Sequence, residues 1–171
     1  MGEWKDIMQG LLIAITSAQK YVYIQSPYLL PTEPILLALK TAAAAGVDVR
    51  IMIPEKSDSR MVHWGTMSYL QELMEAGIKI YMYQKGFLHS KLIVCDDCLS
   101  SVGSTNMDFR SFEHNFEINA FMYDKTSALM LKDIFLSDQK DAKLLHLKEW
   151  RMRPWSQKVK ESVIRLFAPL L

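Results

Sequence analysis

The sequence predicts an α/β fold in which one mixed, largely parallel central sheet has helices on both faces. Three observations indicate this class. Short runs rich in aromatic and β-branched residues alternate with longer runs of helical periodicity. Two of the helical runs end at a glycine, Gly46 or Gly77, and a strand-like run follows at once. Half of the 171 residues are hydrophobic and the formal net charge is +1, which is typical of a globular chain with a buried core. We therefore expect a single domain over residues 1–171.

Each element is assigned from the spacing of its apolar residues. Helices are expected at 4–19, 33–45, 57–76, 124–136, 139–150 and 155–171. Strands are expected at 21–25, 47–53, 78–83 and 115–123, with a hairpin within residues 87–106. The alternation favours parallel βαβ units with right-handed crossovers. No uninterrupted apolar run approaches the ~18 residues that a membrane-spanning helix needs, so this chain is expected to be soluble by itself.

The most informative stretch is the predicted hairpin, where polar residues recur at fixed spacing. Side chains two apart on a strand project to the same face, so His89 and Lys91 are expected side by side, a nucleophile beside a cation. Ser104 and Asn106 are also two apart, on the returning part of the hairpin. These four polar groups can converge on one small anion. Asp96 stands at an odd offset from His89, so a supporting structural role is expected for it.

A second His-x-Lys pair, His146 and Lys148, provides an internal comparison. Arg153 stands where the aspartate of the first motif would be, and no Gly-Ser-x-Asn follows. We interpret this pair as part of a solvated helix face. For the first motif, the alternative is an ordinary buried β-hairpin with a satisfied core histidine. Each further matched position makes that alternative less favoured.

Two residues outside the hairpin are candidates for lining a substrate pocket. Tyr28 follows the first predicted strand, and ligands in α/β sheets bind at the carboxyl ends of strands. Packing of this tyrosine over the strand end is the alternative. His63 is expected near the start of the third helix, facing a strand end. A pocket-lining or simply exposed histidine is favoured there over a second catalytic base.

The run 115–123 alternates polar and apolar residues. Asn115, Glu117 and Asn119 share one face of the predicted strand, opposite Phe116, Ile118 and Ala120. The polar face can look into the site, which makes Glu117 a candidate.

Charge is distributed unevenly along the chain. Residues 140–171 carry eight Lys or Arg against three acidic residues, whereas residues 1–139 carry 12 against 16. The tail from about 155 to 171 reads as a basic amphipathic helix that can lie on anionic lipid. A solvated helix or packing against the same domain are the alternatives.

Cys95 and Cys98 form a single Cys-x-x-Cys without a second ligand pair, so we expect reduced thiols, no metal and no other cofactor.

The spacing His-x-Lys-x4-Asp-x6-Gly-Ser-x-Asn resembles the motif of the phospholipase D superfamily. The resemblance extends over nearly the whole chain and is closest to the carboxyl-terminal motif-bearing half of bacterial cardiolipin synthases. The stretches that resemble this family are 23–28, 46–54, 75–81, 86–89, 106–112, 115–121 and 165–171. The full-length members have amino-terminal membrane helices and two copies of the motif. Here there is one copy.

The resemblance implies a mechanism and a role for each residue. A histidine attacks a phosphodiester phosphorus and forms a phosphohistidine, and the histidine of the second motif protonates the leaving alcohol. It assigns His89, Lys91, Asp96 and Glu117 to the catalytic set, with Glu117 orienting the imidazole. It also assigns Lys91, Ser104 and Asn106 to phosphate binding.

The implied reaction is the conversion of two phosphatidylglycerol molecules to cardiolipin and glycerol. The expected partners are therefore anionic phospholipid such as phosphatidylglycerol, a membrane surface, and a second motif-bearing half supplied in cis or by a homodimer partner, with no nucleic acid. The full-length protein is expected in the bacterial cytoplasmic membrane. The alternative is a homodimeric single-motif phosphodiesterase or nuclease of the same superfamily. A third possibility is an interaction domain that keeps the hairpin only as a scaffold.

Overall fold

The computed structural model describes residues 6–167. Its helices are α1 (Asp6–Ser17), α2 (Glu33–Ala44), α3 (Arg60–Glu75), α4 (Phe109–Glu113), α5 (Lys125–Gln139), α6 (Leu147–Arg151) and α7 (Trp155–Arg165). Its strands are β1 (Tyr21–Gln25), β2 (Leu29–Leu30), β3 (Asp48–Pro54), β4 (Lys79–Tyr83), β5 (Leu92–Cys95), β6 (Leu99–Gly103), β7 (Met107–Asp108), β8 (Asn119–Met122) and β9 (Ala142–Leu144). The ends of the predicted first and last helices, at residues 4–5 and 168–171, lie outside the described residues.

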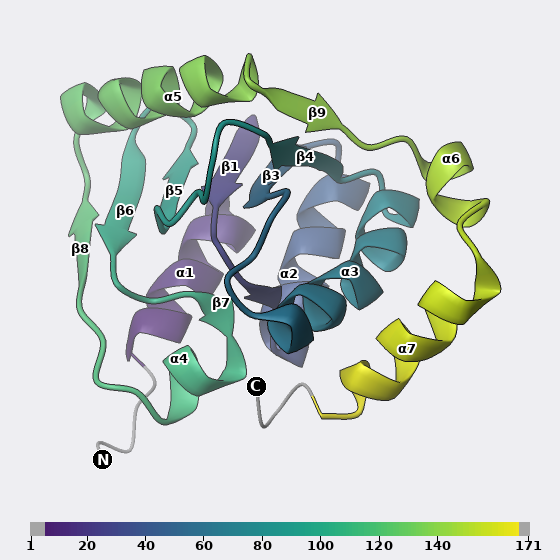
Figure 1. Cartoon of the computed structure of the whole chain (residues 1–171). Coiled ribbons are helices and arrows are strands. Elements are labelled where there is room, and N and C mark those ends of the chain that lie inside the picture. The colour runs from purple at the N-terminus through teal and green to yellow at the C-terminus, as the bar shows by residue number, and fades with distance from the viewer. Residues whose placement is uncertain (1–5, 168–171) are drawn as a thin grey trace.

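Seven strands form one sheet in the order β8-β6-β5-β1-β3-β4-β9 (Figure 1). β1 pairs with β3 and β3 with β4 in parallel, whereas β1–β5, β5–β6, β6–β8 and β4–β9 are antiparallel. The mixed α/β class is confirmed. Within this sheet, parallel pairing is confined to β1, β3 and β4. The sheet is therefore mostly antiparallel rather than largely parallel as expected, because the hairpin and both edge strands add antiparallel neighbours.

Helices cover both faces of the sheet, as expected (Figure 1). On one face, α1, α2 and α3 pack against the apolar side of the central strands, where Ile24, Ile51 and Ile80 are fully buried. On the other face, α5 inserts Phe135, whose ring stacks on that of Tyr23 with centroids 4.9 Å apart. Burial on both sides explains why the central strands are almost continuously hydrophobic.

Local sequence signals fix several helix ends. Ser59 begins α3 and accepts a hydrogen bond from the Val62 amide, and Asp124 begins α5 in the same way from the Ser127 amide. Gly46 and Gly77 follow α2 and α3 with φ of +88° and +91°, a conformation that side-chain-bearing residues rarely adopt. Each glycine lets the chain reverse directly into the next strand.

The predicted helix at 139–150 is wrong. The segment instead contains β9, which pairs with the outer edge of β4, followed by the short helix α6. Pairing with an open sheet edge satisfies a row of β4 backbone groups, and this long-range gain overrides the local helical pattern. His146 precedes α6 and Lys148 lies within it, and both side chains are exposed, in agreement with the interpretation of that pair as a solvated face.

A second small sheet was not predicted. β2 pairs in parallel with β7, so the loop after β1 is held beside the segment that follows the Gly-Ser-Thr-Asn turn. The hydroxyl of Ser26 accepts a hydrogen bond from the Met107 amide and donates one to the Tyr28 carbonyl oxygen. Two loops that are far apart in sequence thereby meet at the carboxyl end of β1.

Within residues 6–167, no helix is both long enough and apolar enough to cross a bilayer.

Candidate active site

His89 and Lys91 lie immediately before β5 rather than within a strand. The Lys91 carbonyl oxygen accepts a hydrogen bond from the Gly103 amide, which continues the β5–β6 ladder by one step. The Lys91 ammonium donates a hydrogen bond to the His89 carbonyl oxygen at 2.8 Å. The His89 imidazole is exposed and packs beside the Phe87 ring, with centroids 5.2 Å apart. The imidazole nitrogens form no hydrogen bond within the described chain, so they are accessible to a substrate.

Ser90, between the two motif residues, anchors this tripeptide to the sheet. Its hydroxyl donates a hydrogen bond of 2.6 Å to the side-chain oxygen of Gln25 at the end of β1. The Gln25 amide nitrogen donates in turn to the Asp138 carboxylate on α5 at 2.8 Å. Gln25 is only 1% exposed, so its polar atoms depend on these partners. This link was not predicted from the sequence, although a glutamine at the end of an otherwise apolar strand is a signal for it.

The Gly-Ser-Thr-Asn turn after β6 is held by Asn119 on β8. The Asn119 side-chain oxygen accepts hydrogen bonds from the Thr105 hydroxyl at 2.7 Å and the Thr105 amide at 3.4 Å, and its nitrogen donates to the Ser101 hydroxyl. A Cβ at Gly103 would lie 2.2 Å from both the Asn119 side-chain oxygen and the Ile118 carbonyl oxygen. Glycine is therefore required here for close approach of two strands, not for an unusual φ.

Ser104 and Glu117 are in direct contact. The Ser104 hydroxyl donates a hydrogen bond to the Glu117 carboxylate and accepts one from the Ile118 amide at 3.0 Å. The Asn115 side-chain amide donates to the same carboxylate at 3.1 Å. The prediction that Glu117 orients the His89 imidazole stays a prediction, since no hydrogen bond joins the two in the described part of the chain.

The predicted strand 115–123 is shorter than expected, because β8 begins only at Asn119. Residues before it form a loop, and the Phe116 and Ile118 side chains are exposed instead of forming an inner apolar face. Glu117 therefore reaches the site from a loop. The alternation was a misleading signal, since no neighbouring strand pairs with this part of the segment.

Electrostatic interactions join Lys91 to the same group of residues. Burial lowers the pKa of the Lys91 ammonium, and the carboxylates of Glu117, Asp108 and Asp58 act in the opposite direction. No ion pair joins Lys91 to a carboxylate among the described residues, so its charge is available to an anion. The carboxylates partly offset the effect of burial on this half-buried cation.

Asn106 and Asp108 form the buried floor of this cluster. Burial raises the pKa of the Asp108 carboxyl, and hydrogen bonds from Ser111 and Asn106 oppose that rise. The side-chain oxygen of Asn106 is buried without a hydrogen-bond partner in the described structure. Ser104 bonds Glu117, Asn106 bonds Asp108, and both carboxylates act on the Lys91 charge, so these residues form one cluster in which Asp108 was not predicted. Phosphate binding by Lys91, Ser104 and Asn106 stays a prediction.

Asp96 lies at the opposite end of β5 from His89 and Lys91. Its carboxylate accepts hydrogen bonds from three consecutive backbone amides, those of Gln19, Lys20 and Tyr21, at 2.6–2.9 Å. Asp96 itself has φ of +53° in the β5–β6 turn. This motif residue fixes the hairpin to the start of β1, the kind of structural role expected from strand parity.

The two predicted pocket residues have different surroundings. The Tyr28 hydroxyl donates to the Asp58 carboxylate at 2.8 Å, and Asp58 acts on Lys91, so Tyr28 borders the site. Burial is the main cause that raises the pKa of the Tyr28 hydroxyl to about 12, and the hydrogen bond to Asp58 adds to the rise.

His63 lines a separate cavity of about 450 Å³, together with Trp64, Trp150 and other residues of α3, α6 and α7. Burial lowers the pKa of the His63 imidazole.

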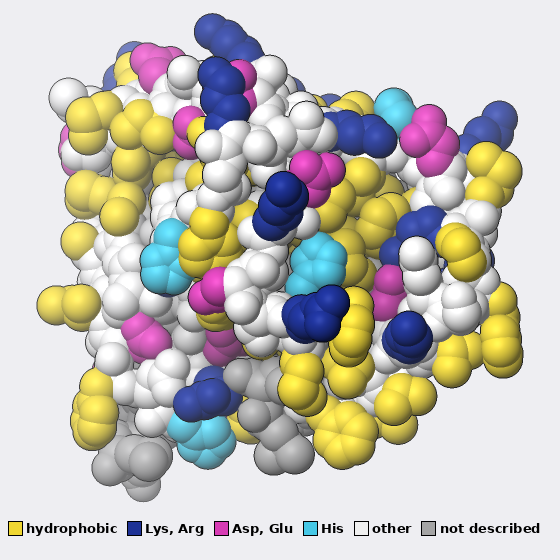
Figure 2. Space-filling model, viewed as in Figure 1, with side chains coloured by type: hydrophobic (Ala, Val, Ile, Leu, Met, Phe, Trp, Pro, Cys, Tyr) yellow, Lys and Arg dark blue, Asp and Glu magenta, His cyan; other side chains and the backbone are white. Residues whose placement is uncertain are grey.

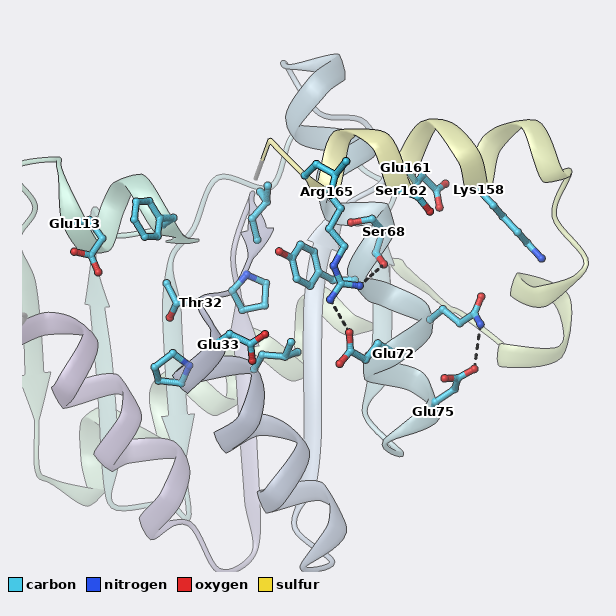
Figure 3. Close-up of a pocket in the computed structure, with 18 of the residues that line it drawn as sticks. Thr32, Glu33, Ser68, Glu72, Glu75, Glu113, Lys158, Glu161, Ser162 and Arg165 are labelled. Atoms are coloured by element: carbon cyan, nitrogen blue, oxygen red, sulfur yellow. Dashed lines mark hydrogen bonds and ion pairs between the residues drawn. The ribbon is translucent and has the colours of Figure 1, made fainter. Parts of the chain in front are cut away.

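The motif borders a smaller cavity than one found elsewhere in the described structure. A cleft of about 580 Å³ borders His89, Lys91 and Gly103. The larger cavity, about 960 Å³, lies among the α2, α3, α4 and α7 regions, with Arg165 reaching Glu72 and Ser68 across it (Figure 3). Within residues 6–167, no group of three His, Cys, Asp or Glu side chains is arranged to hold a metal ion. Cys95 and Cys98 are free thiols.

The fold and the motif define a phospholipase D-like domain. Nuc of Salmonella typhimurium, a phospholipase D family member, superposes with a TM-score of 0.70 at 23% identity, over 81% of this chain and 90% of that one. Phosphatidylserine synthase of Haemophilus influenzae superposes with a TM-score of 0.77 at 16% identity, over 97% of this chain and 45% of that one. These likenesses establish the fold alone.

The family follows from sequence. Residues 11–139 match the family model described as "Cardiolipin synthase, PLD-like domain", and the chain belongs to this family. It is 47% identical to a cardiolipin synthase of Geobacillus kaustophilus over 99% of its length, and 48% identical to cardiolipin synthase 1 of Staphylococcus epidermidis over 97%. The chain spans about a third of the length of these relatives. The predicted family membership is confirmed.

Proposed function

We propose that this chain supplies one half of the active site of a bacterial cardiolipin synthase. The observation that supports this most is identity of about 47% along nearly the whole chain to cardiolipin synthases, together with the cluster of Lys91, Ser104, Asn106 and Glu117 next to an accessible His89. The reaction transfers a phosphatidyl group from one phosphatidylglycerol to the terminal hydroxyl of another. One phosphodiester replaces another, so no nucleotide is consumed.

In the first step, an imidazole nitrogen of His89 attacks the phosphorus of phosphatidylglycerol. The phosphorus–nitrogen bond forms, the bond from phosphorus to the glycerol oxygen breaks, and a histidine of a second motif gives its proton to the departing glycerol oxygen. The Lys91 ammonium and the polar groups of Ser104 and Asn106 stabilise the phosphoryl oxygens as their charge redistributes. The side-chain oxygen of Asn106 is a buried acceptor without a hydrogen-bond partner in the described structure. Ser104, which contacts Glu117, is exposed.

In the second step, the hydroxyl of another phosphatidylglycerol attacks the phosphohistidine. The histidine that gave up its proton takes the proton of this hydroxyl, and the phosphorus–nitrogen bond breaks to release cardiolipin. Water in place of the lipid hydroxyl would release phosphatidic acid, so the assembled site must exclude it. The full-length protein works at the bacterial cytoplasmic membrane, where both lipid molecules are found.

The second histidine comes from the remaining part of a longer protein in cis. The relatives are about three times as long as this chain, which supports this arrangement. The alternative is a homodimer in which two copies each supply one motif and act as a phosphodiesterase or nuclease. Its support is the fold likeness to Nuc, which covers 90% of that shorter chain. The excess of acidic residues in positions 1–139 argues against a nucleic-acid groove.

Complementation tests the proposal. Residues 1–171 alone should give little cardiolipin from phosphatidylglycerol, and activity should appear when the remaining portion of a full-length relative is added. His89→Ala should abolish it, whereas His146→Ala, in the exposed second His-x-Lys pair, should leave it unchanged. Retained lipid transfer by His89→Ala excludes the catalytic role assigned to His89. Cleavage of bis(p-nitrophenyl) phosphate by the isolated chain, dependent on His89, would instead favour the homodimer.

A further inference from the structure

The apolar stripe of α7 faces solvent. Trp155, Val159, Val163 and Leu166 recur at i, i+4, i+8 and i+11 and therefore lie on one side of the helix. Their exposed fractions are 78%, 38%, 49% and 79%. The exposed side chains of Met152 and Phe167 extend the stripe at its two ends. The sequence left open whether this apolar face packs against the same domain, and in the described structure it is uncovered.

The opposite, polar side of α7 attaches the helix to the domain. Glu161 is buried and pairs with Arg153 through two hydrogen bonds of 2.6 and 2.9 Å. Arg165 reaches Glu72 on α3 at 2.7 Å (Figure 3). Its guanidinium also lies 4.2 Å from the centroid of the Tyr69 ring. Turning the helix to bury its apolar stripe would break both ion pairs and leave Glu161 unpaired, so the outward orientation is the preferred one.

A lysine lies beside the stripe on the same helix. Lys160 is exposed, forms no ion pair with a carboxylate of the described residues, and has its ammonium 6.0 Å from the centroid of the Trp64 ring. Hydrophobic side chains gather over α7 at the lower right of Figure 2, with Lys and Arg side chains beside them. An apolar stripe with a tryptophan at one end and a lysine at its margin is the pattern of a helix that lies in the interface of an anionic bilayer.

We infer that α7 is a membrane-surface contact that binds anionic phospholipid bilayers through Trp155, Val159, Val163 and Leu166, with Lys160 facing the headgroups. This surface is separate from the His89 cleft. The inference rests on the proposed function in one respect, namely that the substrate is a bilayer lipid. The occupant is an anionic lipid surface rather than a protein because Lys160, without a carboxylate partner among the described residues, lies beside the stripe, and residues 140–171 carry eight Lys or Arg against three acidic residues. A helix held parallel to the surface keeps the domain at a fixed height above its substrate.

Co-sedimentation with vesicles tests the inference. The full chain should bind vesicles of phosphatidylglycerol and phosphatidylcholine, and should bind phosphatidylcholine alone weakly. Val159→Asp combined with Val163→Asp should lower binding by at least about tenfold, since it removes apolar contact and adds negative charge. Lys160→Glu should lower binding by roughly tenfold at low salt, with a smaller effect at high salt. The matched control is Ile13→Asp with Leu37→Asp, two exposed apolar residues on α1 and α2.

The outcomes separate this surface from the catalytic proposal. His89→Ala should bind vesicles like the unchanged chain, and the α7 double variant should retain activity on detergent-dispersed phosphatidylglycerol once the second half is supplied. Unchanged vesicle binding by the α7 double variant overturns the inference whatever the activity. If the variant instead loses only self-association or binding to the second half, the inference is also overturned, and the stripe is a protein interface.

Discussion

At the scale of single residues, the site depends on polar side chains that hold the motif in place from behind. His89 and Lys91 precede β5, so strand pairing alone does not fix their orientation. Ser90 provides the missing constraint through its hydrogen bond to buried Gln25, and Gln25 is fixed by Asp138. Gln25 does not belong to the catalytic set, because its contacts reach the motif only through Ser90. It is a positioning residue.

Gln25→Met tests this role while keeping the side-chain volume similar. We expect kcat of the reconstituted enzyme to fall by about tenfold with little change in KM, because the reacting group is misplaced while substrate contacts remain. The free energy of unfolding should fall by roughly 1–3 kcal/mol, since the Asp138 and Ser90 partners lose their bonds. Steady-state kinetics and urea unfolding measure the two effects.

The control and the coupling test use other residues of the chain. Gln71→Met, at a glutamine that only bonds Glu75 on the same helix, should leave kcat unchanged. Ser90→Ala added to Gln25→Met should lower kcat little further, because both substitutions remove the same hydrogen bond. Fully additive losses in kcat would contradict the positioning role.

At the scale of elements, ion pairs rather than apolar packing join α7 to the rest of the molecule. Glu72 on α3 bonds Lys40 on α2 at 2.8 Å and Arg165 on α7 at 2.7 Å, so one carboxylate links three helices. Burial by itself would raise the pKa of the Glu72 carboxyl, but the hydrogen bonds from Lys40 and Arg165 outweigh it and lower the pKa below its ordinary value of 4.5. The attachment of α7 therefore depends on pH.

The pH dependence has a defined sign. A carboxyl with a lowered folded-state pKa adds stability above its unfolded value, and this stability is lost as the pH falls through the folded value. We expect the free energy of unfolding to decline below about pH 4.5 and Glu72→Gln to make that decline shallower. The variant should also lose roughly 1 kcal/mol at pH 7.

Urea unfolding at a series of pH values measures this effect, with Glu55→Gln, at an exposed glutamate, as the control. If the free energy of unfolding declines equally steeply at acid pH in Glu72→Gln and in the unchanged chain, then the bonds of Glu72 to Lys40 and Arg165 do not cause the decline.

At the scale of the whole molecule, the sheet separates two cores. The larger one lies under α1, α2 and α3, and the smaller one lies under α5. Cys95 belongs to the larger core on β5, where it is only 2% exposed, and burial raises its pKa to about 12. Cys98, three residues later in the hairpin turn, is exposed. The two thiols therefore report on different parts of the molecule.

Thiol labelling should proceed in two stages. At neutral pH, a maleimide should modify Cys98 quickly and Cys95 only when the sheet opens globally, because the reactive thiolate is scarce and shielded at Cys95. Mass spectrometry should detect one label in the native protein and two in denaturant. Cys98→Ser should take no rapid label, and fast double labelling of the native chain would mean that the β5 face opens locally.

Much of this organisation was readable from the sequence, and the reasons are local. Apolar periodicity, capping residues and the two positive-φ glycines were enough to predict the strands β1, β3 and β4 and the helices α2, α3 and α5. The motif spacing predicted that His89, Lys91, Ser104 and Asn106 would share one site and that Asp96 would turn away from it. Glu117 was predicted from the alternation of 115–123 and from the family resemblance. These features depend on residues close in sequence or on the two-residue period of a strand.

Only the tertiary structure decided the features that require a distant partner. β9 became a strand because β4 offered an open edge, and the start of β8 moved to Asn119 because no neighbour pairs with the residues before it. The link from Ser90 to Gln25 spans 65 positions of the sequence. The stripe of α7 was visible in the sequence, but its outward direction was set by Glu161 and Arg165, since periodicity identifies an apolar face and not what covers it.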